Sequence, residues 1–310
     1  MAEIYYIQVI RKCNQNCRFC SNPSNGKNIT LKDLKKLIDF YAKEKAAAVI
    51  FSGGEPTLYK YLPQAIKYAD SLGLNPRITT NGQKSADIEY LKQLADAGLR
   101  HIHFSLYSHR KEVHEYLTRT PGSYNKIIAA IGNAHRLGLH TDLNTVINKL
   151  NSKHLHLMVK FIIKKFPFIR HIVFNNMDPG MNRAIEDMST VPVFSEFEAS
   201  LSLAMRTLND SGRTFRVERV PLCFMSEFPY CSTETRKIIK HEDRQTFFLD
   251  EKAMVRQNKW THGYGKRCVF CGVKSICAGL FKPDVYYTTE ELCPIFYDIE
   301  KVKKSVLREK

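Results

Sequence analysis

The stretch IYYIQVIRKCNQNCRFC, residues 4–20, places three cysteines directly after the first apolar run of the chain. Its first seven residues are rich in β-branched and aromatic side chains, which is typical of a strand. Cys13, Cys17 and Cys20 follow in a polar loop, with three and then two residues between them. A disulfide uses two cysteines and a structural zinc site normally four, so this loop fits neither. The stretch therefore predicts a strand followed by an unusual metal-binding turn.

The alternation of short apolar runs with amphipathic stretches continues to about residue 176. Six strand–helix units in series predict a parallel sheet with right-handed crossovers, and polar residues on the inward strand faces favour a partial barrel. The predicted fold class is α/β, a partial (β/α)6 TIM-like barrel with a small C-terminal cysteine-rich domain. Strands are expected at 4–10, 48–53, 76–82, 100–108, 139–148 and 170–176, and helices at 30–45, 61–73, 86–98, 123–138 and 152–165.

Capping residues support these helices. Gly73, Gly98 and Gly138 close three of them at the position where a left-handed glycine often ends a helix. Thr30, with Asp33 three residues later, is a predicted N-cap. We expect the barrel core at 1–185, a connecting helical region at 186–215, and a C-terminal domain at 216–310 that ends in a solvated helix.

Composition indicates the class of protein. The chain has 310 residues, nine cysteines and a formal net charge of +16. It shows no secretory signal and no apolar run long enough to span a membrane, so a cytoplasmic location is expected, where cysteines bind metals or catalyse rather than form disulfides. The charge favours an acidic partner such as a peptide, a phosphorylated metabolite or nucleic acid, or else belongs to solvated helix surface.

Three thiolates at this spacing can hold one corner of an iron–sulfur cube and leave its fourth iron without a protein ligand. CNQNCRFC (13–20) resembles the CxxxCxxC signature of the radical S-adenosylmethionine (radical SAM) enzymes, and GGEP (53–56) stands at the end of the second strand, as in that family. The resemblance implies that S-adenosylmethionine binds the open iron of a 4Fe–4S cluster. A zinc ribbon completed by a distant cysteine is the alternative.

The resemblance also implies a cofactor pocket at the strand ends. Glu55 and the backbone of Gly53 and Gly54 are expected to meet the methionine amino group, and Arg119 its carboxylate. Tyr107 stands where many relatives carry an acidic residue, which removes the usual ribose contact. The remaining expected pocket residues are Phe19, which lies near the adenine, and Thr80, Asn81, Ser105 and Asn144.

A second group of cysteines lies near the C-terminus. KRCVFCGVKSICAG contains Cys268, Cys271 and Cys277 and resembles the auxiliary-cluster modules called SPASM and twitch domains. Residue 281 is phenylalanine where a full SPASM module has a further cysteine, which implies one auxiliary 4Fe–4S cluster. Cys223 is the expected fourth ligand, with Cys293 and then Cys231 as alternatives. An open site that binds substrate and a zinc site are the other interpretations.

Histidines on the fourth strand are further candidates. His101 and His103 alternate with Ser105, so all three should face the barrel interior, together with Gln8 and Asp142 on other strands. His103 is the candidate catalytic residue, as a substrate contact or proton shuttle. A hydrogen-bonded interior histidine is the alternative interpretation.

The resemblance implies an enzyme that reductively cleaves S-adenosylmethionine and abstracts a substrate hydrogen, with flavodoxin or ferredoxin as reductant. We expect oxidative modification or cross-linking of a peptide or protein. The first alternative is a dehydrogenase or rearrangement enzyme acting on a small metabolite. The second is an RNA-modifying or non-catalytic nucleic-acid-binding iron–sulfur protein.

Overall fold

The computed structural model describes residues 4–180 and 183–308, and the chain forms two compact units. The first comprises Met1–Leu106, Arg110–Asn144 and Asp243–Gln257, and the second comprises Tyr107–His109, Thr145–Glu242 and Asn258–Lys310. The first unit therefore takes in a segment from the region that the sequence assigned to the C-terminal domain. The boundaries at 185 and 215 stay a prediction.

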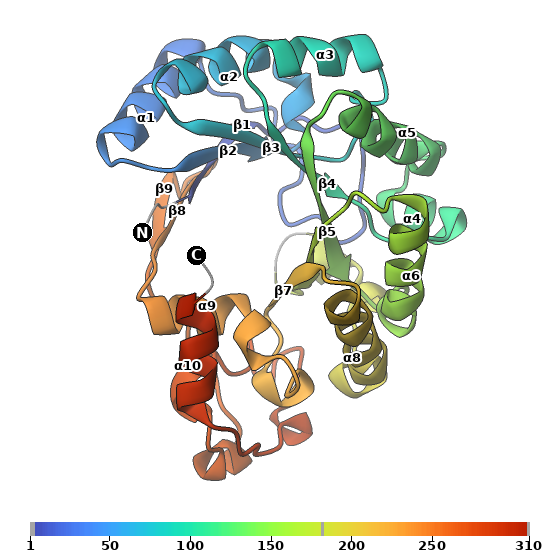
Figure 1. The fold of residues 1–310 in the computed structure, drawn as a ribbon, viewed down its shortest axis with the longest axis vertical. Coiled ribbons are helices and arrows are strands. Elements are labelled where there is room, and N and C mark those ends of the chain that lie inside the picture. Colours follow the sequence, from blue (N-terminus) through green and yellow to red (C-terminus); the bar gives the residue numbers. More distant parts are fainter. Residues whose placement is uncertain (1–3, 181–182, 309–310) are drawn as a thin grey trace. The chain divides into compact units, whose positions relative to one another are not determined.

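The first unit is built on parallel strands. β1 (Ile4–Ile10), β2 (Ala48–Gly53), β3 (Asn75–Thr80), β4 (His101–Ser105) and β5 (His140–Ile147) pair with one another in sequence order. Figure 1 shows α1 (Leu31–Lys43), α2 (Leu62–Ser71) and α3 (Ile88–Asp96) along one face of β1–β3. The predicted α/β class and its strands are confirmed, each strand to within three residues at either end.

The predicted helix caps are confirmed. The Thr30 hydroxyl accepts the backbone N–H of Asp33 at 3.1 Å at the start of α1. Gly73, Gly98 and Gly138 all have positive φ, as a left-handed residue after a helix requires. The sequence analysis identified α5 (Ser123–Arg136) but missed α4 (Lys111–Thr118), a helix of eight residues that precedes it.

A late segment of the chain completes the sheet of the first unit. β8 (Arg244–Phe247) pairs in parallel with β1, and β9 (Met254–Gln257) pairs antiparallel with β8. The buried Arg11 donates to Asp250 at 3.2 Å, and the backbone N–H of Leu249 donates to the Gln8 side chain at 3.1 Å. The sequence predicts no strand in this segment. Strands of four residues without a clear apolar alternation carry too weak a pattern to be recognised.

The second unit contains β6 (His171–Asn176) paired in parallel with β7 (Thr214–Glu218). Its helices are α6 (Leu155–Lys165), α7 (Arg183–Glu186), α8 (Phe194–Asp210), α9 (Thr233–Lys240) and α10 (Ile299–Arg308). α8 lies within the region at 186–215 for which the sequence predicts helix. The expected C-terminal helix is α10, which buries Val302 and Val306 and leaves its other described residues exposed or half-buried.

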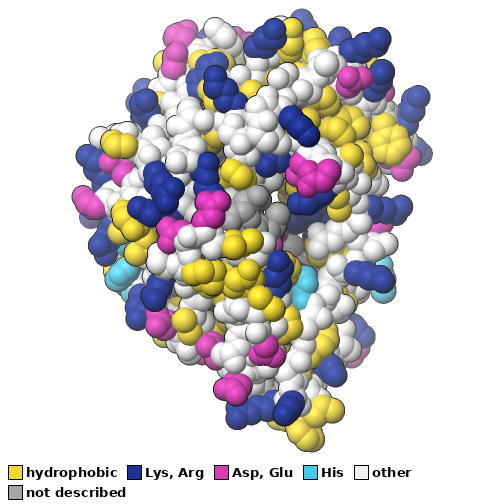
Figure 2. Space-filling view, turned by 180° about the vertical axis from the view of Figure 1, so that it is seen from behind, with side chains coloured by type: hydrophobic (Ala, Val, Ile, Leu, Met, Phe, Trp, Pro, Cys, Tyr) yellow, Lys and Arg dark blue, Asp and Glu magenta, His cyan; other side chains and the backbone are white. Residues whose placement is uncertain are grey.

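Within residues 4–180 and 183–308, no helix combines the length and the apolar character needed to cross a bilayer. Figure 2 shows that lysine and arginine side chains are dispersed over the visible face, among acidic and apolar groups, rather than gathered in one stripe.

Candidate functional site

The cysteine loop that follows β1 is held by the end of α4. The backbone N–H of Asn16 donates to the carbonyl of Thr118 at 3.1 Å, and that of Arg18 to Leu117 at 2.9 Å. The Arg18 guanidinium also lies 3.9 Å from the centroid of the Tyr116 ring. Cys13, Cys17 and Cys20 are half-buried and form no disulfide. The loop is therefore fixed through its backbone, and none of its three thiols is consumed in a disulfide.

The environment of Cys13 keeps its thiol protonated in the absence of metal. Burial raises the pKa of Cys13 to about 11, although the backbone N–H of Gln15 opposes this by donating to the sulfur at 3.4 Å. The Asn81 side-chain amide lies 3.7 Å from the same sulfur and donates to Asn14 at 2.8 Å. Metal binding would release the proton and turn these amides into partners of a thiolate.

Two glycines let the end of β2 lie against the end of β1. Gly54 N–H donates to the Ile10 carbonyl at 2.6 Å, and Glu55 N–H to the Lys12 carbonyl at 2.9 Å. A Cβ atom would stand 2.0 Å from the Ile10 oxygen if placed on Gly53, and 2.3 Å from the Lys12 oxygen if placed on Gly54. Any side chain here would clash with backbone, so the glycines bring GGEP directly beside the cysteine loop.

The Glu55 carboxylate joins this turn to β3. It is 1% exposed, and its Oε1 accepts the Thr57 N–H at 3.1 Å and the Thr57 and Thr80 hydroxyls at 2.6 Å each. Its Oε2 accepts the Asn81 N–H at 2.8 Å. Burial raises the pKa of Glu55, and these hydrogen bonds oppose the rise. All four donors come from the protein, so a contact between Glu55 and the methionine amino group stays a prediction.

The other expected pocket residues lie as follows. Phe19 and Thr80 are buried, and Ser105 on β4 is the register partner of Asn144 on β5. Arg119 follows α4 in a left-handed conformation, with φ of 48°. The structure brings Cys13, Glu55, Thr80 and Asn81 together through the contacts described above. The cofactor roles of all these residues stay predictions.

The expected shared face of the fourth and fifth strands is confirmed. His101 Nε2 lies 2.7 Å from an Asp142 carboxylate oxygen, and His103 Nδ1 lies 3.7 Å from the same oxygen. His140, which the sequence analysis did not single out, contacts the other oxygen at 3.1 Å. His140 lies two residues before Asp142 on the predicted strand at 139–148, and this alternation is the pattern that could have identified it. A catalytic role for His103 stays a prediction.

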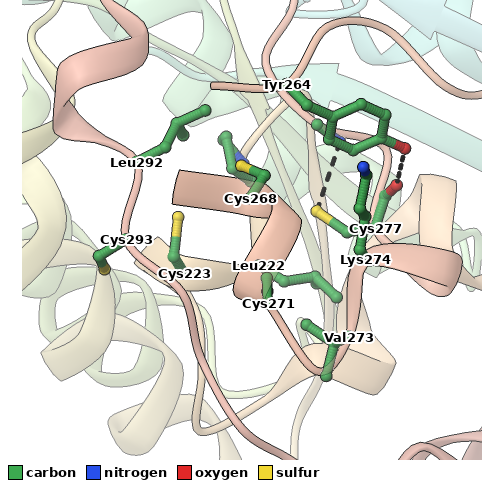
Figure 3. A pocket seen from close by; sticks show the side chains of 12 residues that line it. Leu222, Cys223, Tyr264, Cys268, Cys271, Val273, Lys274, Cys277, Leu292 and Cys293 are labelled. Atoms are coloured by element: carbon green, nitrogen blue, oxygen red, sulfur yellow. Dashed lines mark hydrogen bonds between the residues drawn. The ribbon is translucent and has the colours of Figure 1, made fainter. Parts of the chain in front are cut away.

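The C-terminal cysteines converge on one pocket within the second unit. Cys223, Cys268, Cys271, Cys277 and Cys293 all line it, and its empty volume is about 320 Å³. Figure 3 shows these side chains arriving from separate segments, with the sulfur of Cys223 directed into the space between them. Five thiols from several segments form a donor set with the sulfur chemistry that iron–sulfur clusters and zinc require.

Both leading candidates for the fourth ligand are at this pocket. Burial raises the pKa of Cys223 to about 12, and the neighbouring Cys293, Cys277 and Cys268 raise it further, against a backbone N–H of Cys293 that lowers it. Cys231 is buried, and the described residues that line the pocket do not include it. The structure therefore leaves Cys223 and Cys293 as the candidates.

The sequence profile of the radical SAM superfamily matches residues 7–162, which is half of the chain. The chain belongs to the radical SAM superfamily. Enzymes of this family use a 4Fe–4S cluster and S-adenosylmethionine, and the matched range contains the CxxxCxxC loop and GGEP.

Curated relatives and solved structures extend this result. The radical SAM chain is 29% identical to PqqA peptide cyclase of Bradyrhizobium diazoefficiens over 48% of its own length and 40% of that protein. It is 29% identical to Fe-coproporphyrin III synthase of Methanosarcina barkeri over 84% of its own length and 64% of that protein. The chain thus spans less than two thirds of each relative. Streptococcus suis SuiB bound to S-adenosylmethionine has a similar fold, with a TM-score of 0.66, 14% identity, and coverage of 90% of this chain and 73% of SuiB.

Proposed function

We propose that this radical SAM protein is an enzyme that binds a 4Fe–4S cluster through Cys13, Cys17 and Cys20 and oxidatively modifies or cross-links a peptide or protein substrate. The anchored loop with three thiols that form no disulfide carries the proposal, because it offers one ligand fewer than a closed site needs. The name of PqqA peptide cyclase, a relative over about half of this chain, supports the peptide substrate.

The residues of the first unit would hold and orient the cofactors. With S-adenosylmethionine bound and one electron delivered by an external reductant, the cluster would supply reductive cleavage to methionine and a 5′-deoxyadenosyl group able to take a hydrogen atom from a substrate. Glu55 fixes the end of β2 to the end of β3, and the glycine contacts set both beside Cys13. These contacts keep the predicted cofactor-binding backbone rigid, which is what positioning of a reactive group requires.

The pocket of five cysteines supports a second cluster. A substrate that loses one hydrogen atom is left as a radical and still has to lose an electron before the net reaction is a two-electron oxidation, so an electron acceptor would be needed. Cys268, Cys271 and Cys277, completed by Cys223 or Cys293, have the donor chemistry to hold such a group. A zinc ion on the same thiols would give a structural site without redox function.

A small acidic metabolite is the second candidate substrate. The relative that aligns over 84% of this chain is named Fe-coproporphyrin III synthase, which makes a porphyrin product the specific alternative. The net charge of +16 suits a polycarboxylate as well as an acidic peptide. The dispersed cationic side chains in Figure 2 give no support to a nucleic-acid-binding stripe.

The test is anaerobic reconstitution with iron and sulfide, followed by incubation with S-adenosylmethionine and dithionite or reduced flavodoxin. We expect about eight irons per chain, which corresponds to two 4Fe–4S clusters, and formation of 5′-deoxyadenosine. Cys17→Ala should abolish 5′-deoxyadenosine formation, whereas Cys231→Ala, outside the pocket lining, should not.

Substrate class requires separate assays. Peptides encoded beside the gene and a panel of porphyrin carboxylates should be compared for stimulation of 5′-deoxyadenosine formation and for a product that has lost hydrogen. A peptide product supports the first proposal, and a porphyrin product replaces it with the second. Wild-type protein that forms no 5′-deoxyadenosine with any of these substrates contradicts the enzymatic proposal.

A further inference from the structure

His101 and His103 on β4 lie beside His140 and Asp142 on the neighbouring strand β5. The register aligns His101 with His140 and His103 with Asp142. Residues two apart on a strand share a face, so all four side chains stand on the same side of the sheet. The Asp142 carboxylate lies at the centre of the contacts, with His101 and His103 near one oxygen and His140 near the other.

The geometry of three of these groups suits a metal ion. His101, His103 and Asp142 each offer one donor atom, and the three atoms lie within 4.8 Å of one another. A tetrahedral ion at ordinary zinc–ligand distances separates its ligand atoms by about 3.4 Å. The distances to Asp142 are 2.7 Å from His101 and 3.7 Å from His103, so small side-chain rotations are enough to complete such a site.

Burial and access also fit an ion. The side chain of Asp142 is 6% exposed, that of His101 is 12% exposed, and that of His103 is 17% exposed, which shields the donors from water. The His140 side chain is 58% exposed and contacts the other oxygen of Asp142, with its ring centroid 4.3 Å from that of His101. It can orient the carboxylate from outside, as the partners of metal ligands commonly do.

We propose that His101, His103 and Asp142 bind a divalent transition-metal ion of the zinc class, at a site separate from the cysteine clusters. Imidazole and carboxylate are ordinary ligands for such ions, and three protein ligands leave one position for water or another group. His101 begins β4, and Ser105 ends it about 13 Å away at the usual rise per residue. The ion is therefore placed between the start and the middle of β4, with His103 about 7 Å along the strand from Ser105 of the predicted cofactor pocket.

The positive charge of Arg77 should weaken the binding of a cation beside Asp142, which provides a second test of the metal site. Arg77 is the register partner of His101 on β3, and its positive charge interacts with Asp142 and lowers the pKa of His101, alongside the larger effect of burial. In the absence of metal, the guanidinium and the histidines stabilise the buried carboxylate. A bound cation has to compete with Arg77, so removal of this charge should strengthen metal binding.

The experiment uses full-length protein with its iron–sulfur clusters reconstituted and one equivalent of zinc added, followed by gel filtration and zinc K-edge X-ray absorption. Retained zinc should show nitrogen and oxygen ligands at about 2.0–2.1 Å, with imidazole scattering and without the sulfur shell at about 2.3 Å that cysteines would give. A sulfur shell, or loss of zinc on gel filtration, overturns the proposal.

Single substitutions test which residues bind the zinc ion. His103→Asn should weaken zinc binding at least tenfold, and His135→Asn, at an exposed position of α5, should leave it unchanged. Asp142→Asn serves the same purpose if His103→Asn does not fold, as checked by circular dichroism. Arg77→Met should tighten zinc binding about tenfold, and an unchanged or weaker affinity shows that no ion binds beside Asp142. No assay needs S-adenosylmethionine, so the outcome is independent of the proposed enzymatic function.

Discussion

The Oε2 atom of Glu55 accepts the backbone N–H of Asn81 at 2.8 Å, while its Oε1 accepts the N–H of Thr57 at 3.1 Å. One buried carboxylate therefore satisfies a backbone donor on the turn after β2 and another at the end of β3. The arrangement couples the shape of GGEP to the position of Asn81, whose side chain approaches the sulfur of Cys13.

Glu55→Gln should destabilise the protein by roughly 2–4 kcal/mol, the range expected when a buried charged hydrogen-bond network is broken. Each carboxylate oxygen faces a backbone N–H, so in either orientation the new amide turns its NH2 toward one of them. Urea unfolding of the iron-free protein measures the change. The exposed Glu251→Gln is the matched control and should differ from wild type by less than about 0.5 kcal/mol. Equal stability of the two variants would show that the network contributes nothing.

Gly54→Ala should prevent assembly of the first cluster. The added Cβ would stand 2.3 Å from the Lys12 carbonyl, so the end of β2 and the cysteine loop have to move apart. Iron content after reconstitution should fall by about four per chain. Gly132→Ala is the control, because that glycine lies within α5 and has open space around it. It should keep all its iron and raise the unfolding free energy by about 0.5–1 kcal/mol. Full iron content in Gly54→Ala contradicts the prediction.

Cys13 of the iron-free protein should react slowly with iodoacetamide at pH 8. Thiolate is the reactive form, and burial raises the pKa of Cys13 to about 11. The rate, followed by peptide mass spectrometry, should be at least tenfold below that of N-acetylcysteine and should rise up to about pH 11. A rate that levels off before pH 9 contradicts the raised pKa. The unfolded thiol ionises at lower pH than the folded one, so this residue's contribution to stability should be lost as pH rises from about 9 to 11.

Cys223→Ser should remove about four irons per chain, because Cys223 points into the pocket of five cysteines. Cys293→Ser and Cys231→Ser should retain them, the first because Cys293 is exposed and the second because Cys231 is outside the pocket lining. Iron analysis and the electron paramagnetic resonance signal of the reduced protein report the loss. If Cys293→Ser loses the iron instead, the fourth ligand is Cys293.

The strands of the barrel core were predictable from the sequence because each is a short apolar run that ends in glycine or polar residues. α4 and the β8–β9 hairpin were not predictable, since the former is only eight residues long and the latter pairs with β1, more than two hundred residues away. Local patterns carry no information about such long-range partners.

The candidate sites, like the fold, were predictable from the sequence only in part. Spacing alone identified the thiols of both cysteine groups, but it could not decide between Cys223 and Cys293, because both reach the pocket only through the tertiary fold. The hydrogen bonds that Glu55 accepts from Thr80 and Asn81 were likewise not visible in the sequence, because they depend on the pairing of β3 with β2. His101, His103 and Asp142 were placed on one face by alternation, whereas the central position of Asp142 depends on register.

The discontinuity of the first unit has a consequence for how the chain folds during synthesis. Residues up to 144 emerge from the ribosome well before β8, so the edge of β1 that β8 covers stays open while about 100 further residues are made. At typical translation rates of roughly 5–20 residues per second, this interval lasts about 5–20 s. An exposed parallel edge is a template for pairing with other chains. We therefore expect truncation before Asp243 to yield an aggregating nascent chain, rather than a smaller folded protein.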